Sequence, residues 1–430
     1  MRRKLVLVIL LTLAFVGLVQ LILSPTMSSA LLRSSNSPPL SVAKLSCGFF
    51  MAESSLPRAG LGVYTALPLA KGDFAQPSHD LVLNYFLHQP QVHDNRNGMW
   101  TWQGYHFGAQ FLRNREEGHV YAATAGIVTL NNNMNEKKFA THLQYADPDF
   151  IFSNGGLERQ KDPGAGAITH FFGATTKTLR DVEPGSELLL HSHWMGPKGT
   201  EYQMTDPPTT RSPSWLARHG MCIDHIVAKQ ASDPGMGRGA FAKRSLPKGT
   251  IVAPSPLQIF ESRELFAATT EYEYNLPEMP EDLFVNYCFQ PTNSTFLIFP
   301  YGQGVGLINH NSDPSRINVK LQWSANYMNK LQWLDPDISL EQFWKMYSPG
   351  STIIEAVATK DIAQGDEIFM SYGPEWEEAW NEHVRNWSPP PSSDKYVYAQ
   401  DMDLSEPFRT VDEQQENPYP SNLMIVYDYR

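Results

Sequence analysis

The chain has 430 residues, of which 42% are hydrophobic and 18% are charged. This length and composition imply soluble globular domains, with enough apolar residues for one large core or two of ordinary size. The formal net charge of −11 argues against a nucleic-acid-binding surface and would suit a basic, Lys-rich partner, although ordinary solubility is another explanation for an acidic excess.

The N-terminus combines three basic residues with a long apolar run. Arg2, Arg3 and Lys4 precede residues 5–23, in which polar residues are rare. This order is typical of a secretory signal, and the run just reaches the roughly 20 residues that span a bilayer as a helix. The small residues at 28–30 would suit a cleavage site. Residues 1–30 are therefore expected to be either a signal peptide that is cleaved or a signal anchor that is retained.

Both outcomes predict the same orientation. The basic end stays in the cytosol, so the rest of the chain faces the lumen or the outside. We expect a protein of the secretory pathway, held in the membrane by a single N-terminal span if that segment is uncleaved, with secretion as the alternative. Asn293, in Asn-Ser-Thr, is the one unobstructed glycosylation sequon.

The three cysteines, Cys47, Cys222 and Cys288, lie too far apart in sequence for a CxxC metal site. No metal site is expected for this reason. One disulfide is possible in an oxidising compartment, and the odd number of cysteines leaves at least one thiol unpaired.

A Ser- and Pro-rich tether, residues 31–45, leads into an internal repeat. Gly60, Gly62, Gly72 and Asn132 lie 177 positions before Gly237, Gly239, Gly249 and Asn309, and Gly185 and Glu187 lie 180 positions before Gly365 and Glu367. A near-constant offset at successive landmarks indicates a duplication, so residues 46–196 and 219–387 are predicted to be two copies of one fold. The Pro- and Thr-rich segment 197–218 would be the linker between them.

The second copy is expected to consist of short strands with helical inserts. Strands bounded by Gly or Pro are predicted at 223–229, 240–242, 250–253, 287–290, 295–299, 352–357 and 367–370. Helices are predicted at 262–270, 339–347 and 376–387. Residues 388–430 are expected to be a C-terminal tail, in which 423–427 could dock as a strand.

Three motifs in the second copy carry the polar groups of a candidate site. The first is the Gly-rich turn at 236–242, the second is Asn309-His310 after an apolar run expected to be a strand, and the third runs from Gly365 to Tyr372. Glycine lets the backbone approach a ligand closely or take a positive φ, and Asn and His at a strand end offer an amide and an imidazole. A turn that needs no ligand is the alternative for such a stretch taken alone.

In this order the three motifs resemble the SET-domain family of protein-lysine methyltransferases, whose pattern runs from a GxGRG turn through an Asn-His pair to a GxE stretch that ends in a Tyr. The resemblance extends from Gly235 to Tyr372. The sequence departs from the family at two points. Asn311 stands where the family usually has Ser, and no CxC with a third Cys follows Tyr372, so the zinc-binding flank of many histone methyltransferases is absent.

The resemblance implies a mainly β fold with two tandem SET-like domains of short strands and turns. In the first copy, Leu61, Asn133 and Ser192 stand where the second copy has Arg238, His310 and Tyr372. Because the imidazole and the aromatic hydroxyl are missing there, the first copy is interpreted as a degenerate, non-catalytic SET-like domain.

The resemblance also implies a reaction, namely methyl transfer from S-adenosylmethionine to the amine of a lysine in a protein substrate. Tyr372 would be the catalytic residue. The cofactor would be held by Gly237, Arg238, Gly239, Asn309 and His310. Tyr287, Tyr301 and Trp376 are candidates for an aromatic wall of the substrate channel, which would receive a cation by π contact. Ordinary core packing is the alternative for these three rings, and a solvated surface position is the alternative for Arg238.

Two functions therefore remain open. One is a membrane-anchored or secreted lysine methyltransferase that uses the second copy, and the other is a non-catalytic binding or scaffold protein of the secretory pathway. Intact Tyr372, Asn309 and His310 favour the enzyme. The predicted luminal location favours the scaffold, because S-adenosylmethionine is made in the cytosol and would have to be transported.

Overall fold

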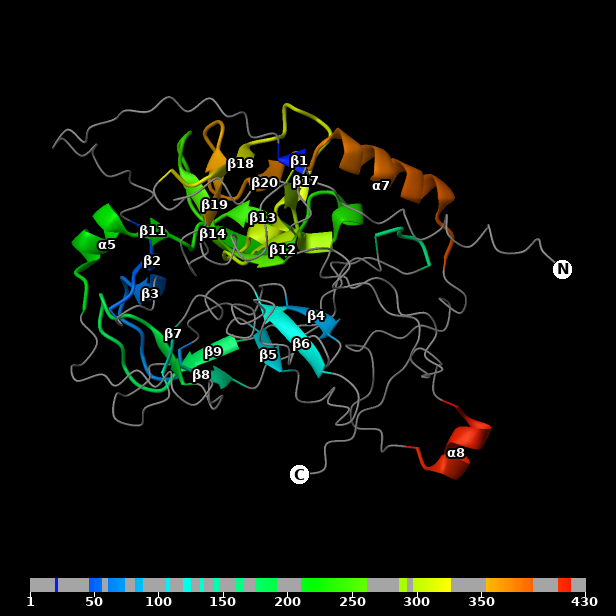
Figure 1. Cartoon of the computed structure of the whole chain (residues 1–430), viewed down its shortest axis with the longest axis horizontal. Helices are drawn as coiled ribbons and strands as arrows, with labels where there is room; N and C mark the ends of the chain where they lie inside the picture. The colour runs from blue at the N-terminus through cyan, green and yellow to red at the C-terminus, as the bar shows by residue number, and fades with distance from the viewer. Residues whose placement is uncertain are drawn as a thin grey trace, which may run out of the picture.

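The computed structural model describes residues 20–21, 46–55, 61–73, 82–87, 106–108, 119–124, 132–134, 143–146, 160–164, 175–191, 210–260, 286–291, 297–325, 353–389 and 409–418. In these residues the fold is mainly β with few helices, as the sequence predicts. Figure 1 shows the described elements along the chain.

The first half contributes strands β1 Gln20–Leu21, β2 Phe49–Glu53, β3 Leu61–Thr65, β4 Val82–Leu87, β5 His106–Gly108, β6 His119–Thr124, β7 Asn132–Met134, β8 Leu143–Ala146, β9 Thr175–Thr178 and β10 Leu189–His191. The second half contributes strands β11 Met221–Cys222, β12 Ile226–Gln230, β13 Arg238–Ala242, β14 Ile251–Phe260, β15 Gln290–Pro291, β16 Leu297–Pro300, β17 Asn309–His310, β18 Val319–Trp323, β19 Ile353–Ala358 and β20 Glu367–Met370. The helices are α5 Pro213–His219, α7 Pro374–Asn386 and α8 Val411–Glu416, with 3-10 turns η3 Pro234–Met236 and η6 Val305–Leu307.

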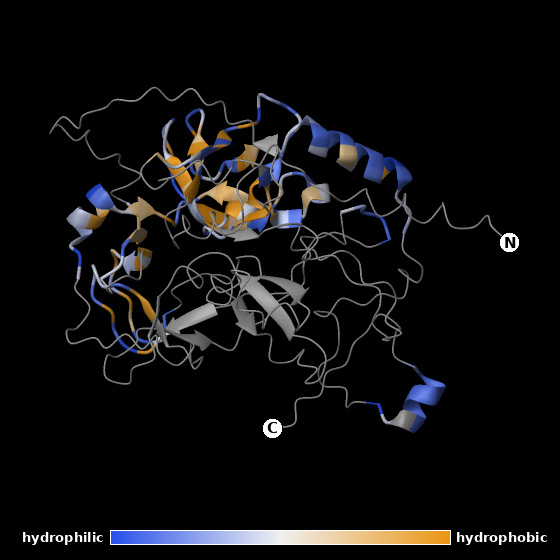
Figure 2. Cartoon of the chain, in the orientation of Figure 1, coloured by the Kyte–Doolittle hydropathy of each residue, from blue (hydrophilic) through white to orange (hydrophobic). Residues whose placement is uncertain are grey.

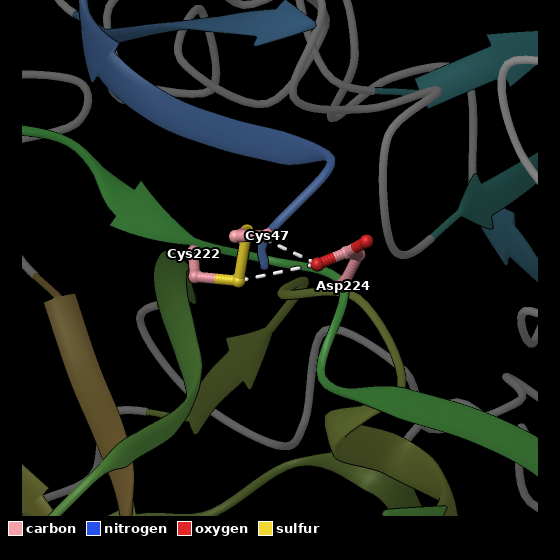
Figure 3. A group of neighbouring side chains, drawn as sticks. All are labelled: Cys47, Cys222 and Asp224. Atoms are coloured by element: carbon pink, nitrogen blue, oxygen red, sulfur yellow. Dashed lines mark hydrogen bonds between the residues drawn. A yellow bond between two sulfur atoms is a disulfide. The ribbon is translucent and has the colours of Figure 1, made fainter. Parts of the chain in front are cut away.

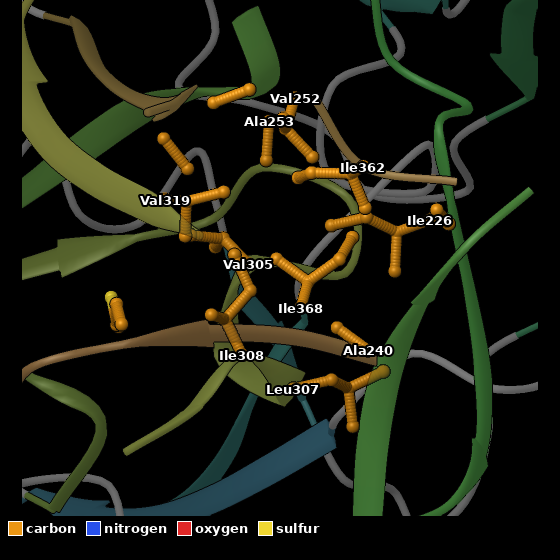
Figure 4. Packing of buried hydrophobic residues seen from close by; sticks show 14 of the residues in the cluster. Ile226, Ala240, Val252, Ala253, Val305, Leu307, Ile308, Val319, Ile362 and Ile368 are labelled. Atoms are coloured by element: carbon orange, nitrogen blue, oxygen red, sulfur yellow. The ribbon is translucent and has the colours of Figure 1, made fainter. Parts of the chain in front are cut away.

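Two four-stranded sheets in the second half contribute to the main hydrophobic core. Their strand orders are β12-β13-β20-β17 and β16-β14-β19-β18. Every residue of β19 and β20 is buried. Figure 4 shows Val305, Ile308, Ile362 and Ile368 gathered in this core. Figure 2 shows that hydrophobic residues are concentrated in strands of these two sheets. Full burial of each aliphatic side chain contributes about 1.5–3 kcal/mol.

The pairing of β17 with β20 positions the motifs. These two strands run parallel, with Asn309 opposite Phe369 and His310 opposite Met370. β20 also pairs with β13, which begins within the Gly-rich turn. All three motifs therefore meet in one sheet, although they are widely separated in sequence.

The N-terminal half contributes to four further sheets, with orders β11-β2-β3, β7-β10-β8-β9, β4-β6-β5 and β1-β15. The first of these takes β11 from the second half, paired antiparallel with β2. Helix α5 is capped by Ser212 and buries Leu216 and Ala217 in a cluster with Phe50 of β2. Residues 213–218 of the predicted linker therefore belong to a packed helix, and the division of the chain at 197–218 stays a prediction.

A disulfide joins the two halves beside this sheet (Figure 3). Cys47 and Cys222 are bonded across a sequence separation of 175, with their Cα atoms 5.9 Å apart. Oδ1 of Asp224 lies 3.0 Å from Sγ of Cys47 and 3.2 Å from Sγ of Cys222. Arg244 Nη1 donates to the same oxygen at 2.8 Å, and Lys243 Nζ donates to Oδ2 at 3.1 Å. Burial would raise the pKa of Asp224, but these two cations hold it below its ordinary value.

Among the described residues, Cys47, Cys222 and Asp224 are the group whose ligand atoms lie close enough together to hold a metal ion. The two cysteines are joined in the disulfide, so they offer no thiolate to a metal. Cys288 is buried and is not part of a disulfide.

Most predicted strands of the second copy are confirmed, as are the hairpin that pairs Phe289 with Ile298 and the closing helix α7. The apolar run before Asn309 was predicted to be a strand, and this is wrong. It forms η6, because Gly304 takes a left-handed φ of 73° and its carbonyl accepts the N–H of Leu307 at 3.1 Å. The predicted tail contains the helix α8. The predicted helices at 262–270 and 339–347 and the strand at 423–427 lie outside the described residues.

Within the predicted N-terminal helix, the structure describes Gln20–Leu21, and these two residues form β1, parallel to β15. The helix prediction is wrong for them, because their backbone is paired with Gln290–Pro291 and not within a helical turn. The rest of residues 1–30 lies outside the described residues. No helix in the described part of the chain is both long and apolar enough to cross a membrane.

Candidate active site

Two glycines shape the first motif. Gly237 takes φ 68°, which L side chains rarely adopt. At Gly239, an added Cβ would lie 2.3 Å from Oε1 of Glu367 and 3.3 Å from Nδ2 of Asn309. No side chain fits there without displacing these groups, so the backbone of the first motif lies directly against the other two motifs.

The second motif is tied to the first by Asn309, whose Nδ2 donates to the carbonyl oxygen of Arg238 at 2.9 Å. Asn311, the departure from the family pattern, closes the turn after β17. Its Oδ1 accepts the N–H of Asp313 at 3.0 Å, and its own N–H donates to Met370 at 3.1 Å. Ser forms side-chain-to-backbone turns of the same kind, so the departure preserves the local structure.

His310 connects the second motif with the third. Its Nδ1 accepts the backbone N–H of Tyr372 at 3.1 Å, and its Nε2 lies 3.4 Å from Oγ of Ser312 and 3.9 Å from Oε2 of Glu377. Burial lowers the pKa of His310, and the carboxylate of Glu377 partly opposes this. The imidazole is therefore neutral at physiological pH, and Nδ1 serves as an acceptor.

The hydroxyl of Tyr372 donates to the carbonyl oxygen of Ile308 at 2.7 Å. Burial raises the pKa of Tyr372, and the neighbouring Tyr287 raises it further. The phenol therefore keeps its proton. Because a hydroxyl has one donor and two acceptor positions, its oxygen can still accept a hydrogen bond from an approaching amine.

Aromatic side chains lie beside Tyr372. Trp376 lies edge-on to Tyr372 with 4.9 Å between ring centroids, and its ring is 5.0 Å from that of His310. Tyr287 packs against the main core, as Tyr372 does. Burial raises the pKa of Tyr287, and the charge of Arg238 opposes this.

Tyr301 occupies a different position. It is 3% exposed, and its N–H donates to the carbonyl of Pro256 at 3.1 Å, which joins it to β14. Its role in a substrate channel stays a prediction. The described contacts bring together Arg238, Gly239, Asn309, His310, Tyr372 and Trp376, with Tyr287 beside Tyr372.

Two buried polar residues hold the third motif, and the sequence did not predict them as part of the site. Oε2 of Glu367 accepts the N–H of Ser232 at 2.8 Å, whereas its Oε1 is buried without a hydrogen-bond partner among the described residues. Asn318 donates from Nδ2 to the carbonyl of Glu367 at 2.8 Å and accepts the N–H of Phe369 at 2.9 Å. Glu367 was visible as a landmark of the repeat, but a single Asn gives no comparable signal.

The site fits a ligand that is held through backbone groups. At Gly239 the backbone lies against Oε1 of Glu367, a buried oxygen without a hydrogen-bond partner among the described residues, and the Asn309 amide lies beside it. The residues present therefore fit the cofactor that the resemblance implies. Gly237, Arg238, Gly239, Asn309 and His310 are the residues that would hold it.

Comparison with known proteins gives a family for this region. Residues 237–373 match the family model of the SET domain. No sequence among the curated proteins matches the chain.

The solved structures that are similar to this one include the following three. A Plasmodium falciparum protein described as a histone methyltransferase is 20% identical over 36% of this chain and 96% of its own, with a TM-score of 0.22. The methyltransferase domain of human PR domain-containing protein 2 is 13% identical over 41% of this chain and 99% of its own, with a TM-score of 0.21. An autoinhibited ctPRC2 bound to S-adenosylmethionine is 19% identical over 41% of this chain and 19% of its own, with a TM-score of 0.25. These scores are too low to assign residues by superposition. The similarity to the SET domain therefore lies in residues 237–373 of this chain.

Proposed function

We propose that this chain is an S-adenosylmethionine-dependent protein-lysine N-methyltransferase whose active site lies in residues 219–387. One observation carries the proposal. The pairing of β17 with β20 places Asn309 and His310 against the Gly-rich turn on one side and against Tyr372 on the other. These are the residues on which the family resemblance rests, and they converge although the chain separates them.

The side chains would divide the work as follows. S-adenosylmethionine, when bound, supplies a methyl group on a sulfonium sulfur. Tyr372 directs its proton to Ile308, so its oxygen accepts an N–H of the lysine amine and orients the nitrogen lone pair. Burial raises the pKa of Tyr372, so it does not serve as a general base at neutral pH. Tyr287 and Trp376 exclude water, and desolvation favours the neutral, nucleophilic amine.

We further propose that residues 46–196 are a degenerate SET-like copy. The hairpin β2–β3 has the register of β12–β13 at an offset of 177, with Phe49 opposite Thr65 and Ile226 opposite Ala242. The bridge between Leu69 and Val182 corresponds to that between Leu246 and Ile362. The parallel pairing of Asn132 with Leu189 corresponds to that of Asn309 with Phe369.

Hydrogen bonds outside the strands support the same proposal. The N–H of Gly185 donates to Thr65 at 2.6 Å, and the N–H of Gly365 donates to Ala242 at 2.8 Å. The N–H of Lys71 donates to Oδ1 of Asp181 at 2.8 Å, and the N–H of Lys248 donates to Oδ1 of Asp361 at 2.7 Å. A near-constant offset in hydrogen-bonded contacts is harder to obtain by accident than a few matching glycines.

The proposed location is the secretory pathway, with the chain beyond the tether in the lumen or outside and the N-terminal segment as a membrane anchor if uncleaved. The Cys47–Cys222 disulfide supports this proposal, because disulfides persist mainly in oxidising compartments. The substrates would then be lysine-containing secretory or extracellular proteins, and not nucleic acids.

The test begins with calorimetric titration of the purified full-length chain with S-adenosylmethionine. Methyl transfer to lysine-containing peptides is then measured by mass spectrometry. We expect binding and transfer. Tyr372→Phe removes one hydroxyl, so it should retain cofactor binding but change the rate or the number of methyl groups added. Absence of cofactor binding by the wild-type chain would overturn the enzyme and leave the non-catalytic scaffold as the function.

A further inference from the structure

Helix α7 begins directly after the third motif, and none of its residues is buried. Figure 1 shows it extending from the region of β17 and β20 away from the sheets, and Figure 2 shows that it is mostly hydrophilic. A helix of this length is marginal on its own in water, and packing of one face normally provides most of its stability. The half-buried residues of α7 include Trp376, Trp380 and His383, and Nε2 of His383 lies 3.1 Å from the carbonyl oxygen of Pro163.

One face of α7 carries an aromatic stripe, defined here as Trp376, Trp380 and His383. Residues at this spacing lie on the same side of a helix. Trp376 and Trp380 are stacked, with centroids 5.9 Å apart and planes inclined by 9°, and the rings of Trp380 and His383 are 5.5 Å apart. All three side chains are half-buried. The stripe begins at the candidate active site, because Trp376 also contacts Tyr372.

Carboxylates flank the aromatic stripe. The sequence of α7 holds Glu375, Glu377, Glu378 and Glu382 against a single arginine, Arg385. At about 100° per residue, Glu375 and Glu382 lie on one side of the stripe and Glu377 lies on the other. Carboxylates beside indole faces attract cations by charge and by cation–π contact.

Helix stability does not account for this acidic pattern. Glu375 and Glu377 lie in the first turn, where negative charge is favourable to the helix dipole. Glu382 lies near the other end, where negative charge is unfavourable. It also follows Glu378 by four positions, and like charges at this spacing destabilise a helix. Binding of a positively charged partner would offset this cost.

We propose that α7 is a docking surface for basic residues that flank the methylated lysine of the substrate. This inference rests on the proposed function and narrows its substrate class to Lys- or Arg-rich segments. Trp380 is about 6 Å beyond Trp376 along the helix, at about 1.5 Å per residue. An extended peptide advances about 3.3 Å per residue, so the recognised cations lie about two to four positions from the target lysine.

The test measures peptide binding by fluorescence anisotropy, with the full-length chain and saturating S-adenosylmethionine. Two labelled synthetic peptides each contain one lysine, flanked at those positions by Arg in one peptide and by Glu in the other. The wild-type chain should bind the Arg peptide at least about tenfold more tightly. Glu382→Lys and Trp380→Ala should each remove most of this difference, and neither should change the Kd for S-adenosylmethionine.

The control is Glu416→Lys on α8, which makes the same charge change at an exposed position of another helix. Circular dichroism verifies the folding of each variant, and the exposed position of Glu382 keeps the test usable if Trp380→Ala unfolds. If Glu382→Lys and Glu416→Lys reduce the preference for the Arg peptide equally, then only net charge matters, and this result would overturn the docking surface. Cofactor binding without any preference for the Arg peptide would also overturn it while leaving the proposed function intact. No cofactor binding at all would count against the proposed function itself.

Discussion

At the scale of single residues, Glu187 and Glu367 occupy matching positions but have different partners. Oγ of Ser54 donates to Oε1 of Glu187 at 2.7 Å. Ala231 stands 177 positions after Ser54 and has no hydroxyl, and Oε1 of Glu367 is buried without a hydrogen-bond partner in the described structure. An unsatisfied buried acceptor destabilises the folded state. Adding a hydroxyl at Ala231 should therefore stabilise the chain, and removing the hydroxyl of Ser54 should destabilise it.

Ala231→Ser should therefore raise the free energy of unfolding by about 1 kcal/mol, because the new hydroxyl can donate to Glu367. Ser54→Ala should lower it by about 1–3 kcal/mol, because it leaves Glu187 with an unmade hydrogen bond. Urea denaturation of the full-length chain measures both changes. A loss of stability in Ala231→Ser would mean that the two positions are not equivalent and would weaken the case for a duplication.

Asn309 provides a residue-scale test of which copy holds the cofactor. Its amide fixes the carbonyl of Arg238 beside the Gly-rich turn, so Asn309→Ala should weaken S-adenosylmethionine binding by about 1–3 kcal/mol. Asn132→Ala, at the matching position of the first copy, should leave binding unchanged. Calorimetric titration measures the affinity of both variants for S-adenosylmethionine. Weaker binding in Asn132→Ala but not in Asn309→Ala would mean that the active copy has been assigned wrongly.

At the scale of elements, His225 makes the segment between β11 and β12 sensitive to pH. It is 2% exposed, and its Nδ1 accepts from Nη1 of Arg244 at 2.9 Å. Burial and then the charge of Arg244 lower the pKa of His225 to about 4, although Asp224 opposes this. Between about pH 6.5 and pH 4 the unfolded chain binds a proton that the folded chain does not, so stability decreases as the pH falls.

The loss should approach about 1.4 kcal/mol per pH unit over this window and level off below about pH 4. Other histidines with lowered pKa values, such as His310, act in the same direction, so the informative quantity is the difference between wild type and His225→Asn. The variant keeps an acceptor for Arg244 but does not titrate. Denaturation measured across this range gives the slope of stability against pH for both proteins. If stability depends on pH as steeply in His225→Asn as in the wild type, then His225 is not the source of the pH dependence.

The elements also show what the sequence could predict. Strands β19 and β20 were predicted because their apolar runs are bounded by turn residues, and burial of all their side chains agrees with that pattern. The turn η6 was missed because its conformation depends on the left-handed Gly304, which an apolar run does not reveal. Helix α8 was missed although Thr410 and Glu413 form a capping box, which is a signal the sequence does contain.

The candidate site was predictable only in part. Tyr372, His310 and Asn309 were identified from their order in the chain, and the structure brings them together. The sequence did not identify the carbonyl of Ile308 as a partner of Tyr372 or the carboxylate of Glu377 as a neighbour of His310. These contacts depend on how β17 and α7 pack around β20. Side-chain types are visible in a sequence, whereas backbone groups and contacts made by tertiary packing are not.

At the scale of the whole molecule, the Cys47–Cys222 bond closes a loop that spans most of the first half. The three cysteines allow three possible pairings, so the sequence could not identify this one. A loop of this length stabilises the folded state by about 5 kcal/mol in the chain-entropy model. Cys47→Ser, or reduction of the wild type, should therefore lower the denaturation midpoint. Cys288→Ala leaves the cross-link in place, so it should not cause this decrease.

The oxidation state of this bond in cells also tests where the chain resides. A chain that folds in an oxidising lumen should be isolated with the disulfide formed, so alkylation after unfolding but before reduction should modify Cys288 alone. Burial raises the pKa of the Cys288 thiol, which protects it in the folded protein, so the reagent must be added in denaturant. Mass spectrometry counts the modified cysteines, and protease protection in sealed microsomes reports the orientation independently. Modification of all three cysteines together with digestion from the cytosolic side would refute the luminal location and make cytosolic or nuclear proteins the substrates to test.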